Sequence, residues 1–330
     1  MSEPLKISPN ESMSPRFRTG VRAGITSGLR KGLRGYLWIC RILLPVSFAV
    51  ALLDWTGWLY ALDPVFQPLM GIMNLPPQAA LPILTAVFTS FYAGLVMIVV
   101  IPFTEAQVTL LAVFTTICHM LIVEGLIQHK AGLSFVQTTA VRLVTAGATV
   151  YVVSLFFTGT ETPVAMPETL GQTVGLGDML VAWTVSTLQL LGKILLIIIP
   201  VMVALETLKA LGWSERLASA FRPFMTVLGL SPGVSGMWVA GAFFGIVYGS
   251  AVICEEAASG QCSREELKRL HISLGINHSM VEDPALFLAL GISLFWTVIP
   301  RILAAAAAVH LYRIVSAAAR ARAERRAAPA

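Results

Sequence analysis

Long apolar stretches, near or above the length that crosses a lipid bilayer, are the feature that most constrains this chain. A transmembrane helix needs about 20 predominantly apolar residues, and such stretches cover residues 36–61, 179–209 and 291–315, among others. Charged residues make up 12% of the 330 residues, which is about half the share of a soluble domain. The sequence therefore predicts an all-α, multi-pass membrane protein.

The two halves of the chain resemble each other in sequence. Pro45 falls on Pro200 when LLPVSFAVALLDWTGW is aligned with IIPVMVALETLKALGW, a shift of 155 residues, and FQPLMGIMNLPP meets FRPFMTVLGLSP at the same shift. The match then resumes at a shift of 159 residues, with His119 on His278, Glu124 on Asp283 and Arg142 on Arg301. Shared apolar composition alone would not pair such residues in one order. We infer two repeats, residues 36–158 and 179–315.

Each repeat contains the same five segments in the same order. They are a long apolar helix, a short amphipathic piece, an apolar segment rich in small residues, a histidine-bearing segment and a closing helix. In the two repeats these cover residues 36–61 and 179–209, 64–75 and 215–229, 84–100 and 238–253, 107–128 and 267–288, and 134–157 and 291–315.

Lysine and arginine predict the topology. The leader (residues 1–35), which we expect to be disordered or to lie on the membrane surface, and the tail (residues 316–330) are basic. Cytoplasmic loops carry an excess of Lys and Arg, so both ends should face the cytoplasm. The connector (residues 159–178) has neither residue and should lie outside, in the periplasm. Each repeat must then cross an odd number of times, which leaves one of its four apolar segments unable to span.

The segment rich in small residues is our candidate for a re-entrant hairpin. The fold prediction is then two inverted repeats, with about six transmembrane helices, two re-entrant hairpins and broken helices. Inverted repeats are common in secondary transporters, where the binding site lies near the bilayer midplane at broken helices.

The histidine-bearing segment of the second repeat places polar residues among apolar ones. His271, Gly275, His278 and Glu282 are spaced 4, 3 and 4 apart, a spacing that makes one stripe on a continuous helix. Pro284 should kink or break the helix, because proline cannot donate a backbone hydrogen bond. The neighbouring side chains of Asn277 and Asp283 could contact a polar substrate.

The first repeat carries a similar set. His119 and Glu124 are five residues apart, so they share a helix face only if the helix is distorted there. A lone charge at the bilayer centre costs about 2.5–3.5 kcal/mol or more, so such residues usually pair or line a pathway. Two alternatives follow. Both repeats build one polar site, or His278 and Glu282 only hydrogen-bond each other and hold two helices together.

Two arginines and a metal alternative complete the candidate site. Arg142 and Arg301 could each neutralise a carboxylate or extend to the membrane interface. Imidazole and carboxylate are ordinary ligands of divalent metals. If the site binds a metal, the candidate ligands are His119, His278 and Glu282.

Several classes of function are not indicated. The chain has no Walker-type phosphate loop, no H-E-x-x-H and no G-x-S-x-G, so we expect neither enzymatic activity nor ATP hydrolysis, and no cofactor. The four cysteines form no C-x-x-C pair, which argues against a disulfide framework. The net charge of +5 is concentrated at the two ends, which points to membrane topology and not to nucleic-acid binding.

The segments NHSMVEDP (277–284) and CHMLIVEG (118–125), with a basic leader running into LWICRILLPVS, resemble a known domain. They are similar to the nucleoside-recognition or Gate domain of bacterial membrane proteins. Concentrative nucleoside transporters, the membrane part of the ferrous-iron permease and spore maturation membrane proteins share this domain. The resemblance covers about residues 35–315 and implies re-entrant hairpins and broken helices around a central site.

We expect a secondary transporter or permease-like protein in a bacterial inner membrane, as the resemblance implies. It would move a small polar solute or cation, nucleoside-like or a divalent metal, and a proton or sodium gradient could drive it, since histidine titrates near neutral pH. The alternative is a membrane scaffold or partner subunit that transports nothing alone, as the spore maturation proteins suggest. The partners expected are the lipid bilayer, the solute and, for a homo-oligomer, further copies of the chain.

Overall fold

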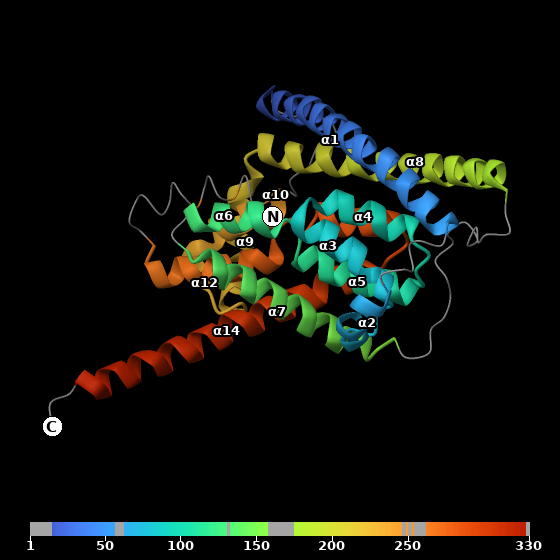
Figure 1. Ribbon diagram of the computed structural model, residues 1–330. Coiled ribbons are helices and arrows are strands. Elements are labelled where there is room, and N and C mark those ends of the chain that lie inside the picture. The colour runs from blue at the N-terminus through green and yellow to red at the C-terminus, as the bar shows by residue number, and fades with distance from the viewer. Residues whose placement is uncertain are drawn as a thin grey trace, which may run out of the picture.

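The computed structural model describes residues 15–56, 63–130, 133–157, 175–245, 249, 253 and 262–327, and every regular element in these ranges is a helix (Figure 1). The first half contains α1 (Pro15–Trp55), α2 (Asp63–Ile72), the short 3₁₀ turn η2 (Pro77–Ala79), α3 (Ala80–Phe88), α4 (Phe91–Val100), α5 (Glu105–Ile117), α6 (Leu121–Lys130) and α7 (Phe135–Ser154). The second contains α8 (Leu176–Ala210), α9 (Trp213–Val227), η3 (Pro232–Val234), α10 (Ser235–Phe244), α12 (Arg264–Asn277), α13 (Glu282–Ala289) and α14 (Leu294–Ala327).

Parts of the predicted organisation lie outside the described residues. They are the first 14 residues of the leader, most of the connector, and most of the second arm of the second hairpin.

Four stretches in the described ranges are long and apolar enough to cross a membrane, which makes this a membrane protein by length and composition. They are Glu105–His129, Phe135–Ser154, Leu176–Ala210 and Leu294–Arg322. A fifth arises if the pair Pro64–Ile72 and Pro77–Phe88, bent by 84°, counts as one span. The total of six spans remains a prediction.

Helices α1 and α8 lie side by side and run in opposite directions (Figure 1). Gly20, Gly24, Gly28 and Gly32 of α1 form the contact surface, and a Cβ on Gly24 or Gly28 would lie less than 3.0 Å from the α8 backbone. Small residues at this spacing let two helix backbones approach closely. Of the two alternatives for the leader, disorder is therefore wrong for residues 15–35, because these residues are helical and pack on α8 through their glycines. The other alternative, a position on the membrane surface, stays a prediction.

Helices α3 and α4 form a hairpin in the first segment rich in small residues. That this hairpin is re-entrant stays a prediction. Ser90 caps α4 by accepting a hydrogen bond from the backbone N–H of Ala93, and a Cβ on Gly94 would lie 2.5 Å from that of Ala86. The same contact recurs 155 residues later, where a Cβ on Gly249 would lie 2.5 Å from the Cα of Gly241.

The two histidine-bearing segments are broken helices. Helix α5 ends at Ile117 and α12 at Asn277. Met120 and Ser279 follow in the left-handed region, with φ of 46° and 51° respectively. This conformation is uncommon for residues other than glycine. The backbone N–H of Met120 then donates to the carbonyl of Ala86 at 2.8 Å, which ties the break to the first hairpin.

The second break lies upstream of the position predicted from proline. Pro284 stands in the first turn of α13, where a missing N–H is tolerated, and the chain leaves helical geometry at His278. The predicted stripe from His271 to Glu282 is therefore wrong, because no single helix carries both residues.

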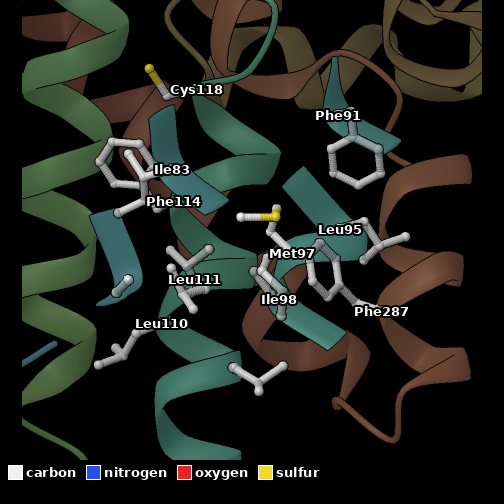
Figure 2. Close-up of a cluster of buried hydrophobic side chains, with 14 of the residues drawn as sticks. Ile83, Phe91, Leu95, Met97, Ile98, Leu110, Leu111, Phe114, Cys118 and Phe287 are labelled. Atoms are coloured by element: carbon white, nitrogen blue, oxygen red, sulfur yellow. The ribbon is translucent and has the colours of Figure 1, made fainter. Parts of the chain in front are cut away.

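A continuous apolar core joins elements of both halves. Figure 2 shows α3, α4 and α5 side chains, such as Ile83, Leu95 and Leu111, in one cluster with Phe287 of α13. Phe91 of α4 packs edge-on against Phe287, with ring centroids 5.9 Å apart. This core holds the two helix breaks against each other.

Candidate functional site

Three buried side chains meet where the broken helices face each other. Nε2 of His119 and Nε2 of His278 are 3.0 Å apart. Oε1 of Glu124 lies 3.3 Å from the first nitrogen and 3.2 Å from the second. The three residues are at most 4% exposed, so the cluster is closed to water on every side in this conformation.

The backbone fixes which ring nitrogen of each histidine carries a proton. Nδ1 of His119 lies 2.7 Å from the carbonyl oxygen of Thr115, and Nδ1 of His278 lies 3.1 Å from that of Leu274. A carbonyl can only accept a hydrogen bond, so Nδ1 donates in both rings. In neutral imidazole Nε2 is then an acceptor, and the three atoms that converge are all electron-pair donors. Such an arrangement requires a cation, either a proton or a metal ion.

Arg142 of α7 holds both the helix break and the carboxylate. Its Nη1 lies 2.6 Å from Oε2 of Glu124, while Nε and Nη2 donate to the carbonyls of Ile117 and His119 at 3.1 and 2.9 Å. These carbonyls are freed by the end of α5. Arg142 is 2% exposed, so of the two roles left open by the sequence it neutralises a carboxylate and does not reach the membrane interface.

Arg301 of α14 makes the equivalent backbone bonds in the second half. Its Nε and Nη2 donate to the carbonyls of Ile276 and His278 at 3.0 and 2.6 Å. The carboxylate differs, however. Asp283 is one methylene shorter than Glu124. Among the residues that the structure describes, its carboxylate forms no ion pair with Arg301, whereas Arg142 and Glu124 form one. The two halves are thus alike in their backbone bonds and unlike in their ion pairs.

The remaining predicted residues are not among the three whose ligand atoms converge. Glu282 accepts a hydrogen bond from the hydroxyl of Tyr92 in α4. His271 and Asn277 are buried, and their side-chain polar atoms have no hydrogen-bond partner among the described residues. The backbone carbonyl of His271 accepts a 3.4 Å hydrogen bond from the amide of Gln128.

The carboxylate at the two histidines is Glu124, whereas the metal alternative had named Glu282. Glu124 is five residues from His119, and the helix break between them brings their side chains to 3.3 Å. On an unbroken helix they would point to different faces. His119, Glu124 and His278 are the only group of three or more His, Cys, Asp or Glu in the described ranges whose ligand atoms could hold a metal ion, all within 4.8 Å of one another.

Comparison with known proteins supports a membrane protein without assigning a function. The chain is 28% identical, over 256 residues, to a Bacillus subtilis (strain 168) protein described as "Uncharacterized membrane protein YvoD". The match covers 76% of this chain and 82% of that protein. No family model matches, so the Gate-domain resemblance remains a prediction, and no solved structure matches.

Proposed function

We propose that this membrane protein is a secondary transporter or permease that moves a small polar solute or cation through a site shared by its two halves. The observation that carries the proposal is the 3.0 Å contact between His119 and His278. These residues are 159 positions apart in the chain and come from different halves. A buried polar cluster at the centre of an apolar chain is expensive, and such clusters usually mark a transport path.

Matched elements in the two halves support a duplicated unit. The N-caps of α5 and α12 are Thr104 and Ser263, and the break residues Met120 and Ser279 are both left-handed. We propose that the repeats are inverted in a bacterial inner membrane, with six spans and both termini in the cytoplasm. In inverted-repeat transporters the binding site lies between the repeats at broken helices.

The closed cluster fits one intermediate of an alternating-access cycle. Glu124, His119 and His278 are buried, so a solute could enter or leave only if the halves move apart on one side. Such a protein interconverts between conformations whose populations the solute shifts. The breaks at residues 118–120 and 278–281 are the places where that movement would occur.

Uptake into proteoliposomes tests the proposal. Purified protein is reconstituted, a proton or sodium gradient is imposed, and radiolabelled zinc and radiolabelled uridine are offered in turn. We expect one of them to accumulate above protein-free liposomes, and His278→Gln to abolish that uptake. His310→Gln is the matched control, because His310 lies outside the cluster and contacts the carbonyl of Val227.

Two results together would contradict transport. Neither solute accumulates under either gradient, and His278→Gln behaves like the unaltered protein in cells that lack the endogenous copy. That pair of results would favour a scaffold or partner subunit.

A further inference from the structure

We infer that the cluster formed by His119, Glu124 and His278 binds a divalent first-row transition-metal ion of the zinc class. This deepens the proposed function, on which it rests in part, by naming the class of cation carried. The ion would bind to Nε2 of both imidazoles and to Oε1 of Glu124.

The spacing of the three atoms suits such an ion. Zinc binds imidazole nitrogen and carboxylate oxygen at about 2.0–2.2 Å, and two ligands of a tetrahedral ion with these bond lengths lie roughly 3.3–3.5 Å apart. The observed separations are 3.0, 3.2 and 3.3 Å. Outward shifts of a few tenths of an ångström would place the three atoms at three corners of a tetrahedron. The fourth coordination position would be left for a water molecule or for a ligand that the ion takes up as it leaves the site.

A proton alone satisfies the cluster less well than a metal ion. The two Nε2 atoms and Oε1 of Glu124 form three pairs of atoms. One proton on either Nε2 can lie between only one of these pairs, and in the other two pairs electron pairs still face each other at about 3 Å without a donor between them. Protonating both rings would instead oppose two N–H groups across the 3.0 Å between His119 and His278. A metal ion is attracted to all three atoms at once.

The donor set selects the type of ion. Imidazole suits zinc and its neighbours, whereas magnesium, calcium and sodium favour oxygen ligands. The three converging atoms also leave no room between them for a nucleoside in this conformation, since none is more than 3.3 Å from another.

Outer contacts already orient the three ligands. The Nδ1–H groups of His119 and His278 donate to the carbonyls of Thr115 and Leu274, and Arg142 holds the second oxygen of Glu124. Metal-binding histidines usually donate their other N–H in this way, and such contacts fix the ring and its tautomer.

Equilibrium binding to the full-length protein in detergent tests the inference. Zn²⁺ is titrated against a chromophoric chelator, and Co²⁺ is followed by the visible absorption of a tetrahedral site. We expect one ion per chain and at least a 100-fold loss of affinity in His119→Gln, His278→Gln and Glu124→Gln, more than the about 10–100-fold that loss of an outer contact costs. Mg²⁺ should not compete.

Matched variants separate loss of a ligand from loss of fold. His271→Gln removes another buried histidine of α12, and Glu282→Gln removes the carboxylate bound to Tyr92. Both should bind Zn²⁺ as the unaltered protein does. If His278→Gln does not fold, His278→Cys supplies a thiolate ligand and should restore Zn²⁺ binding.

Three results would overturn the metal site. They are no Zn²⁺ bound by the folded protein, equal binding by the ligand variants, and equal loss in the two controls. Uptake is a separate readout. Uridine uptake that depends on His278, without Zn²⁺ binding, contradicts the metal site and leaves transport standing. Zn²⁺ binding that depends on all three ligands, combined with no uptake of either solute and with a His278→Gln protein that behaves like the unaltered one in cells, supports the metal site and contradicts transport.

Discussion

Arg142 and Arg301, 159 residues apart, each donate Nε and Nη2 to the two carbonyls that a broken helix leaves free. Only Arg142 also lies within ion-pair distance of a carboxylate in the described ranges, that of Glu124 at 2.6 Å. The bonds to the backbone explain how a helix can end inside an apolar core, because each buried carbonyl finds a charged donor.

Removing either arginine should therefore destabilise the protein to a different extent. Arg142→Met leaves Glu124 buried without its partner and should lower the free energy of unfolding by about 3–5 kcal/mol. Arg301→Met breaks backbone hydrogen bonds without breaking a close ion pair, and should cost about 1–3 kcal/mol. Melting temperatures in detergent test this order, and a larger drop for Arg301→Met would contradict it.

The glycine face of α1 predicts opposite effects for two glycine-to-alanine changes. Gly28→Ala would place a methyl group into the backbone of α8 at Val203 and should cost about 1–3 kcal/mol through overpacking. Gly192→Ala meets no atom of the described residues within 4 Å. It should leave stability unchanged or raise it by up to about 1 kcal/mol, since alanine favours helix. Thermal unfolding of the two variants compares them directly. Equal melting temperatures would show that α1 does not pack on α8 through this face.

The first hairpin can be tested in the same way. Gly94→Ala would bring two methyl groups to 2.5 Å where α4 crosses Ala86, and we expect it to lower stability. The carbonyl of Ala86 also accepts the hydrogen bond from Met120 at the helix break. We therefore expect Gly94→Ala to reduce solute uptake or zinc binding as well. Gly147→Ala on α7, which meets nothing within 4 Å, is the control. Normal stability and binding in Gly94→Ala would argue against a tightly packed hairpin.

The contact between Tyr92 and Glu282 should contribute to stability without contributing to metal affinity. Tyr92→Phe removes the hydroxyl that donates to Glu282 and should cost about 1–3 kcal/mol by leaving a partly buried carboxylate oxygen unpaired. Tyr151→Phe, at a residue that is 51% exposed, should change nothing. Both variants are measured by thermal unfolding and by zinc titration. Loss of zinc affinity in Tyr92→Phe alone would place Glu282 nearer the ion than the structure does.

Local patterns in the sequence predicted most helices and the break in each histidine-bearing segment. Apolar length marked the four candidate spans found in the described ranges. The matched positions of His119 and His278 indicated that these two residues do not face lipid. The helix over residues 15–35 was not predicted, because a segment rich in glycine and arginine is typical of disorder when the helix it packs against is not known. Its partner, α8, lies more than a hundred residues away in the chain.

The composition of the cluster could not be predicted from spacing alone. Glu124 reaches both histidines only because α5 is interrupted after Ile117 and because the second half packs against that interruption. Spacing along one helix favoured Glu282, four residues after His278, since i and i+4 share a face. The break at residues 278–281 removes that relationship and leaves Glu282 with Tyr92.

Anomalous diffraction at the zinc edge, from crystals of the protein grown with Zn²⁺, tests the joining of the two halves most directly. We predict one peak in the interior, within about 2.0–2.2 Å of Nε2 of His119, Nε2 of His278 and Oε1 of Glu124. Two histidines well separated in the density, or a zinc peak bound by other residues, would contradict a shared site.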